Sequence, residues 1–349
     1  MPGKGATIVL CIVALCVGGG TYSYKMRLLG FAQRPGERHN RNTIVVEVAR
    51  GSTPAAIGAV LEERGVITDR KLFTSWLRFV DGSAASLKSG TYELSPSMSP
   101  EEIVGMLQRG RDYEVRITIP EGLRKEEVAA IISAGGFGDV DDVLEVMNDP
   151  SLIADFGVPS VGADGNPGVP GGIDGYLFPE TYGFAPNTPI DQILKRMRRQ
   201  LDSVVDAKMR ARMEVLGWDL HKALTLAAII EEETAQTSER AHISSVFHNR
   251  LRKGMKLQTD PTVIYACEDY HGVIKKRHLQ QEHPYNTYVI PGLPPGPIAQ
   301  PGKAAIVAAL NPTKTNDLFF VAMGDSGQHV FCADLECHTA AAQRYLSTR

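Results

Sequence analysis

Three consecutive glutamates close an apolar run in the stretch AIIEEETAQTSER, at positions 228–240. On an α-helix, side chains that lie three, four and seven positions apart share one face. The face behind Glu233 carries Ile230, Ile229 and Leu226, and it is more apolar than the faces behind the other two glutamates. The spacing therefore predicts that Glu233 points toward the protein interior.

A carboxyl group in this position could act as a general acid. We expect the helix to end near Glu233, where the side chain meets the negative end of the helix dipole. Burial and the dipole both raise the pKa of a carboxyl group, and a raised pKa keeps it protonated near neutral pH. The alternative is that all three glutamates are solvated or form ion pairs with Arg240 or Arg250.

Further polar and aromatic side chains gather in segments that do not read as regular structure. Their hydroxyls, amides and ring faces suit a sugar chain, which presents hydroxyl groups on its edges and C–H groups on its faces. Together they predict an elongated polar groove. These residues come from the stretches LQTDPTVIY, PYNTY and GYLFPETY, and they are Gln258, Thr259, Asp260, Tyr285, Asn286, Thr287, Tyr288, Tyr176, Phe178, Glu180, Thr181 and Tyr182.

Two other motifs favour structural roles. The tetrapeptide GDSG at 324–327 matches the surroundings of a trypsin-like nucleophile, but no upstream histidine lies in a matching context, and we interpret it as a hairpin turn. His278 and His283 in HLQQEH are five positions apart, so they do not share a helical face. The sequence therefore predicts no metal site and no cofactor.

Composition and charge narrow the choice of partner. The net charge is −3 and there is no run of Lys and Arg, so nucleic acid is not an expected partner. Residues 6–22 carry no charge and are mostly apolar, which predicts a retained membrane anchor rather than a cleaved signal. Basic residues follow this run more than they precede it, and that bias alone favours a cytoplasmic body.

A unit of strand, turn and helix recurs along the first part of the chain. It occupies residues 43–67 and 113–137, with a shorter copy at 89–110. We expect the first and the short copy to pair their strands in one small α+β domain. Beyond it, the pattern predicts a Gly/Pro-rich surface loop at 155–175 and a helical stretch at 190–213.

The rest of the chain predicts two helices and a hairpin. The helices are expected at 222–233 and around 243–251, and the hairpin joins DLFFVAM to HVFCA. In an oxidising compartment, Cys332 and Cys337 could close a small disulfide loop; the alternative is two free thiols.

Five ordered motifs resemble those of the endolytic murein transglycosylases, the YceG-like family. They are IPEGLRKEEVA, GYLFPETY, LAAIIEEETAQTSER, VFHNRLRKGMKLQTDPTVIYA and YNTYVIPGLPPGPIAQPG, and the resemblance runs from about Thr43 to the C-terminus. It implies an enzyme that cleaves peptidoglycan glycan strands internally, near nascent chain ends. The implied α+β fold has a transmembrane anchor at 1–25, a tether at 26–42, a LysM-like subdomain at 43–111 and a larger catalytic domain at 112–349.

The resemblance also implies a location and partners. The protein would cross the bacterial cytoplasmic (inner) membrane once and place its catalytic domain in the periplasm or the cell exterior, and this overrides the bias of the basic residues. Expected partners are peptidoglycan glycan strands and the cytoplasmic membrane, with peptidoglycan synthases (penicillin-binding proteins) as further candidates.

The family's catalytic glutamate stands directly before Thr-Ala, which in this sequence is Glu233. Two positions depart from the family pattern. Glu232 occupies a place where lysine is common, and its negative charge should raise the pKa of Glu233. Asp174 stands where a glutamate before Gly-Tyr is usual, and we assign it no chemistry.

The implied mechanism uses one carboxyl group. Glu233 would protonate the glycosidic oxygen between N-acetylmuramic acid and N-acetylglucosamine, then take the proton from the muramyl 6-hydroxyl as this oxygen attacks the anomeric carbon. The product is a 1,6-anhydro end. The expected substrate-binding residues are Gln258, Thr259, Asn286, Tyr288 and Glu180, of which Glu180 is the best candidate for a second acid.

Two alternatives stay open at the level of sequence. One is a two-carboxylate muramidase that uses Glu233 with Glu180 or Asp260. The other is a non-catalytic scaffold that binds the cell wall through its small first domain.

Overall fold

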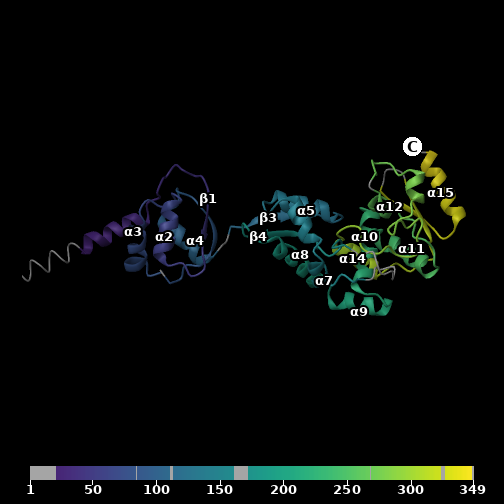
Figure 1. Ribbon diagram of the computed structural model, residues 1–349, viewed down its shortest axis with the longest axis horizontal. Coiled ribbons are helices and arrows are strands. Elements are labelled where there is room, and N and C mark those ends of the chain that lie inside the picture. Colours follow the sequence, from purple (N-terminus) through teal and green to yellow (C-terminus); the bar gives the residue numbers. More distant parts are fainter. Residues whose placement is uncertain are drawn as a thin grey trace, which may run out of the picture. The chain divides into compact units, whose positions relative to one another are not determined.

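The computed structural model describes residues 21–347 except positions 84, 111–112, 161–171, 268 and 324–326. The chain forms two units, of which the first ends at Val115 and the second begins at Arg116 (Figure 1). Each unit combines helices with two-stranded sheets, so the predicted α+β class is confirmed.

The first unit is a strand–helix–helix–strand module. Its strands β1 (Ile44–Val48) and β2 (Gly90–Leu94) are antiparallel, with Val46 opposite Tyr92. The predicted pairing of the first strand with the shorter repeat is therefore confirmed. The helices of this unit are α2 (Pro54–Glu63), α3 (Arg70–Trp76), the π-helix η1 (Leu77–Asp81) and α4 (Pro100–Arg109).

A helix also precedes β1, at residues 21–32. Its Leu28 and Ala32 are buried in the hydrophobic core of the first unit. The segment predicted as a tether thus begins as a packed helix. The predicted anchor falls on residues 6–22, nearly all of which lie outside the described residues. None of the described helices is long and apolar enough to cross a membrane.

The second unit holds the glutamate triplet and most of the helices. Two short sheets belong to it: β3 (Val115–Thr118) pairs with β4 (Thr181–Phe184), and β5 (Phe319–Ala322) pairs with β6 (His329–Cys332). Its helices are α5 (Lys125–Ala134), α6 (Val140–Met147), α7 (Pro150–Asp155), α8 (Ile190–Val204), α9 (Ala207–Leu216), α10 (Leu220–Glu233), α11 (Arg240–Arg252), α12 (Asp260–Ala266), α13 (Lys276–Gln280), α14 (Lys303–Leu310) and α15 (Leu335–Ser347).

Helix α10 is the central helix of this unit. Asp219 caps its N-terminus by accepting a hydrogen bond from the backbone N–H of Lys222. Every residue from Ala223 to Ile230 is buried, because the helix packs against α14 on one side and α11 on another. The apolar run that suggested a core helix does form one, and it ends at Glu233 as predicted.

Two expectations for this unit agree with the structure only in part. The helical stretch at 190–213 is two helices, because Asp206 caps a new helix through the N–H of Met209. Of the surface loop predicted at 155–175, positions 161–171 lie outside the described residues, and Ile173 and Asp174 at its end are buried. The Asp174 carboxylate accepts hydrogen bonds from the Tyr265 hydroxyl, the Gln300 amide and the N–H of Lys125, so it ties this segment to the core.

The predicted hairpin near the C-terminus is confirmed. Strands β5 and β6 are antiparallel, with Phe319 opposite Cys332; GDSG, predicted as its turn, lies mostly outside the described residues. Helix α15 follows β6 directly, and a disulfide joins Cys332 to Cys337 in its first turn. The predicted pairing of these two cysteines is therefore present.

Candidate active site

Each of the three adjacent glutamates has a different environment. The carboxylate of Glu231 is paired with Arg240 and accepts the backbone N–H of Gly302 at 2.9 Å. Glu232 is exposed, and its carboxylate lies so close to Gly122 that a Cβ there would approach it to 2.8 Å. Glu233 alone opens into a cavity. The alternative considered from the sequence, an ion pair with Arg240, is thus correct for Glu231.

The carboxyl group of Glu233 has a strongly raised pKa. Its side chain is partly exposed because it lines the cavity, yet the carboxyl group lies deep in the protein. Burial raises its pKa to about 7, helped by the charges of Asp260 and Glu232; a hydrogen bond from Thr259 and the charge of Arg250 oppose the shift. The group is therefore protonated in a large fraction of molecules at neutral pH.

A network of threonines fixes the segment that faces this carboxyl group. The Thr259 hydroxyl donates to Oε1 of Glu233, and the Thr259 N–H donates to the Thr287 hydroxyl at 3.0 Å. Thr262 joins the network through a 2.8 Å contact with the same hydroxyl. The preceding residue, Gln258, has φ of +51°, a left-handed conformation that non-glycine residues rarely adopt. This backbone is held by its neighbours in a strained form at the edge of the cavity.

The cavity beside Glu233 has a volume of about 370 Å³ and two kinds of lining. The polar lining residues are Arg250, Gln258, Asp260 and Tyr288. The other lining residues are mostly apolar or aromatic, and they are Leu257, Phe319, Phe320, Leu335 and His338. Such a mixture can bind both the hydroxyl groups and the C–H faces of a sugar.

The structure brings some of the predicted residues to this cavity. Gln258 and Tyr288 line it, and Thr259 contacts Glu233 itself. Asp260, the other predicted carboxylate, also lines it and accepts a hydrogen bond from the Tyr288 hydroxyl at 2.7 Å.

Two predicted residues do not reach the cavity. Asn286 is buried, and its amide donates to the carbonyls of His278 and Gln281, so it braces its own loop. Glu180 is exposed just before β4, where its carboxylate accepts a hydrogen bond from Gln200. Both residue types suit a sugar site, but here their side chains form hydrogen bonds with other protein groups.

Several lining residues were missed by the sequence reading. Arg250, considered only as an ion-pair partner, donates Nε to the Leu318 carbonyl and Nη1 to the Leu257 carbonyl, and it lies 5.1 Å from the centroid of the Phe319 ring. The pair Phe319–Phe320 was read as a hairpin strand, and nothing local indicated that it faces Glu233. The contacts of Arg250 with two other segments, one at Leu257 and one at Leu318 and Phe319, follow from the fold and from no local pattern.

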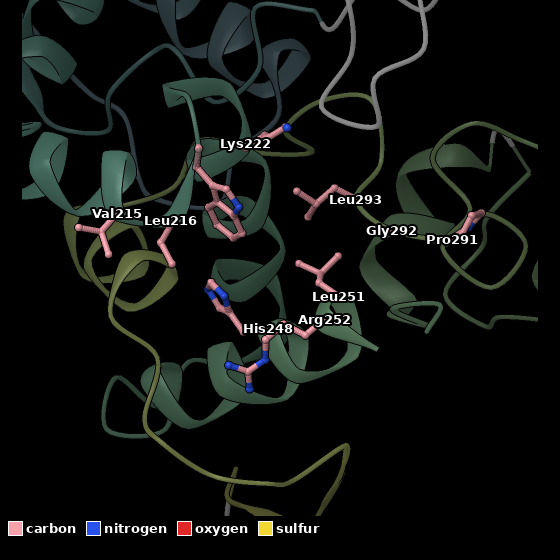
Figure 2. Close-up of a pocket in the computed structure, with 10 residues that line it drawn as sticks. Val215, Leu216, Lys222, His248, Leu251, Arg252, Pro291, Gly292 and Leu293 are labelled. Atoms are coloured by element: carbon pink, nitrogen blue, oxygen red, sulfur yellow. The ribbon is translucent and has the colours of Figure 1, made fainter. Parts of the chain in front are cut away.

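A second, larger cavity lies elsewhere in this unit and contains no carboxylate (Figure 2). Its volume is about 520 Å³, and it lies between α9, α11 and residues 291–293. Trp218 stacks on His248 there, with ring centroids 4.8 Å apart. The His248 ring is further held by the Ala309 carbonyl at 2.8 Å. Without an acidic lining residue, this cavity is not a candidate for acid catalysis.

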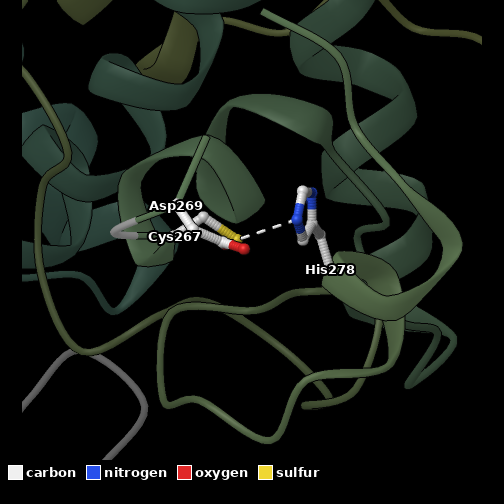
Figure 3. A group of neighbouring side chains, drawn as sticks. All are labelled: Cys267, Asp269 and His278. Atoms are coloured by element: carbon white, nitrogen blue, oxygen red, sulfur yellow. Dashed lines mark ion pairs between the residues drawn. The ribbon is translucent and has the colours of Figure 1, made fainter. Parts of the chain in front are cut away.

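Cys267, Asp269 and His278 also lie close together, with ligand atoms within 4.8 Å of one another (Figure 3). His278 Nδ1 accepts the N–H of Lys275, whereas a metal-bound histidine donates from its second ring nitrogen. The guanidinium of Arg277 contacts both His278 Nε2 and the Asp269 carboxylate. The arrangement is an ion-pair cluster in which Arg277 supplies the positive charge.

The sequence model of the YceG-like family matches residues 46–344. This chain belongs to the YceG-like family. It is 34% identical to the endolytic murein transglycosylase of Bacillus subtilis (strain 168), over 95% of this chain and 91% of the relative. It is 27% identical to the endolytic murein transglycosylase of Streptococcus pneumoniae, over 97% of this chain and 65% of that relative.

A solved structure is similar as well. The crystal structure of a YceG-like protein from Listeria monocytogenes matches with a TM-score of 0.60 and 35% identity, covering 86% of this chain and 99% of that one. The family resemblance read from the five motifs is thus confirmed.

Proposed function

We propose that this protein is an endolytic murein transglycosylase, a lyase that cuts peptidoglycan glycan strands internally, and that Glu233 is its acid and base. The relatives with that name support the activity. The observation that supports Glu233 is its carboxyl group at the end of α10, which has a pKa of about 7 and opens into a cavity with polar and aromatic walls.

The reaction proceeds in two proton transfers through one carboxyl group. Protonated Glu233 gives its proton to the glycosidic oxygen, and the bond from this oxygen to the anomeric carbon of the muramyl sugar breaks. The resulting carboxylate takes the proton of the muramyl 6-hydroxyl while that oxygen bonds to the anomeric carbon. The products are a 1,6-anhydro end and a free hydroxyl on the leaving sugar. Glu233 ends protonated, and no water is consumed.

The neighbours of Glu233 are suited to assist both steps. The Thr259 hydroxyl fixes the orientation of the carboxyl group, so the proton is aimed at one place. The Asp260 carboxylate lines the same cavity and can stabilise positive charge that develops on the sugar ring. Gln258 and Tyr288 present an amide and a hydroxyl to the sugar hydroxyls.

The two-carboxylate muramidase remains the alternative enzyme. Of its two possible partners for Glu233, only Asp260 lines the cavity, and its carboxylate is already engaged by Tyr288. The mass of the products separates the two mechanisms, since hydrolysis adds a water that anhydro formation does not. Anhydro-ended fragments from purified sacculi would support the transglycosylase; fragments with reducing muramyl ends would support the muramidase.

The same digestion tests the non-catalytic scaffold. A scaffold binds glycan strands and leaves their length unchanged, whereas the proposed enzyme shortens them. Purified full-length protein should convert sacculi into soluble fragments, and the Glu233→Gln variant should bind the same sacculi without releasing any.

For the location, we propose a single-pass protein of the cytoplasmic membrane with its catalytic domain outside. Peptidoglycan strands lie on that side, and the disulfide between Cys332 and Cys337 fits an oxidising compartment. A C-terminal alkaline phosphatase fusion should be active, and an inactive fusion would favour the cytoplasmic orientation. The LysM-like character of the first unit and the partnership of the protein with peptidoglycan synthases remain predictions.

A further inference from the structure

The end of the chain supplies one wall of the cavity that contains Glu233. Leu335 and His338, both in the first turn of α15, line it together with Phe319 of β5. Leu335 is 63% exposed, so burial in the folded protein does not explain an aliphatic side chain there. Within the described part of the chain, neither ring nitrogen of His338 has a hydrogen-bond partner. Both side chains are therefore available to a ligand.

These residues are held in place by a short chain of contacts. The His338 ring lies 5.2 Å from the Phe319 ring, and the guanidinium of Arg250 lies 5.1 Å from the centroid of the same ring. Helix α15 packs chiefly on strands β5 and β6. The disulfide joins Cys332 at the end of β6 to Cys337, the residue before His338. The disulfide thus adds one covalent link to the packing that holds Leu335 and His338 beside the cavity.

We propose that Phe319, Leu335 and His338 form a sugar-binding subsite next to the scissile bond, and that the Cys332–Cys337 disulfide holds this subsite in position. The proposal rests on the proposed function, because it takes a glycan strand as the ligand. The apolar side chains match the C–H face of a pyranose ring and the methyl of its N-acetyl group. The imidazole of His338 can exchange a hydrogen bond with a sugar hydroxyl.

The first test separates binding from catalysis. Binding is measured in full-length protein that carries Glu233→Gln, with soluble, uncross-linked glycan strands as the ligand. Adding Leu335→Ala or His338→Ala should raise the dissociation constant roughly tenfold, the effect of one lost contact. In otherwise wild-type protein, the same changes should raise KM by a similar factor and leave kcat nearly unchanged. The matched control is Val215→Ala, which removes another exposed aliphatic side chain from this unit, 74% exposed, and should change neither value.

The second test addresses the disulfide. The double change Cys332→Ala and Cys337→Ala should weaken glycan binding as much as Leu335→Ala does, while Cys267→Ala, which changes the free cysteine of the described residues, should not. Circular dichroism checks that each variant folds. If the double variant does not fold, glycan binding by folded protein before and after reduction of the disulfide decides the question, and unchanged binding after reduction would overturn the role of the disulfide. Wild-type protein that releases no anhydro-ended fragments would refute the proposed function itself. Wild-type activity with unchanged binding in Leu335→Ala and His338→Ala would overturn only the subsite.

Discussion

The Thr259 hydroxyl donates a hydrogen bond to the Glu233 carboxyl group, although Thr259 lies 26 positions further along the chain. The two residues meet because the chain returns to the end of α10 just before α12 begins. The contact opposes the effect of burial on the pKa of Glu233, because a hydrogen bond to the charged form lowers the pKa of a carboxyl group. Thr259 therefore fixes the direction of the acid and limits how far its pKa rises.

Removing this hydroxyl should change both the rate and its pH dependence. Thr259→Val keeps the shape of the side chain and leaves Glu233 without its donor. We expect the pKa of Glu233 to rise further, so the loss of activity on the alkaline side should move to higher pH. The maximal rate should fall, by up to about 100-fold if the carboxyl group is misplaced. Release of anhydro-ended fragments measured from pH 5 to 9 checks both; an unshifted profile would mean that the bond does not influence the acid.

Replacing the proposed acid should abolish cleavage and preserve the fold. In Glu233→Gln the amide matches the carboxyl group in shape but cannot deliver or accept the proton, and loss of one acid/base group lowers a rate about 10²–10⁴-fold. Glu232→Gln is the matched control, because Glu232 is exposed and does not line the cavity; it should stay within roughly tenfold of wild type. Fragment release from purified peptidoglycan measures the activity of both variants. Near-normal activity in Glu233→Gln would show that Glu233 is not the catalytic acid.

The first glutamate of the triplet should matter for stability. Only 6% of the Glu231 side chain and 8% of the Arg240 side chain are exposed, and breaking a buried ion pair destabilises a protein by about 3–5 kcal/mol. Glu231→Gln should therefore lower the midpoint of urea unfolding. The comparison is Asp202→Asn, which breaks an ion pair with Arg198 whose acid is 46% exposed and should change stability by about 1 kcal/mol or less. Equal effects of the two changes would contradict the structural role of Glu231.

The sequence predicted the buried carboxyl group of Glu233 at the end of α10 because the deciding information is local. Ile229, Ile230 and the glutamate lie on consecutive turns of one helix, and helical spacing alone places them on one face. The same is true of the hairpin, whose two strands are close in sequence. Elements of this kind depend on short-range periodicity, so the sequence predicts them without knowledge of the tertiary structure.

The remainder of the site depends on contacts between distant segments. Leu335 and Phe319 reach the cavity only because the hairpin and α15 fold back over it, and no local pattern records that. Asn286 shows the reverse case, since its amide suits a sugar but is used by nearby carbonyl groups. Residue type predicts what a side chain can bind, whereas the partner it meets is decided by tertiary structure.

The pKa of Glu233 also predicts how the rate should vary with pH. The first step needs the protonated acid, and its pKa is about 7. Activity should therefore fall as the pH rises above 7, approaching a tenfold loss per unit. Initial rates of fragment release at constant ionic strength measure this. A rate that keeps rising to pH 9 would mean that the ionised form of Glu233, or another group, carries the first step.

The same group should make the protein less stable as pH rises. The pKa of Glu233 is about 7 in the folded protein against an ordinary value of 4.5, so the folded state binds more protons between these values. Its contribution to stability is present below pH 4.5 and is lost as the pH rises through 7, a change of about 3 kcal/mol. Asp174, with a pKa raised to about 6 by burial, acts in the same direction but is common to wild type and Glu233→Gln. We therefore expect urea unfolding to show that the free energy of unfolding of Glu233→Gln, relative to wild type, is higher at pH 8 than at pH 5. An equal difference at both pH values would show that the carboxyl group titrates normally in the folded protein.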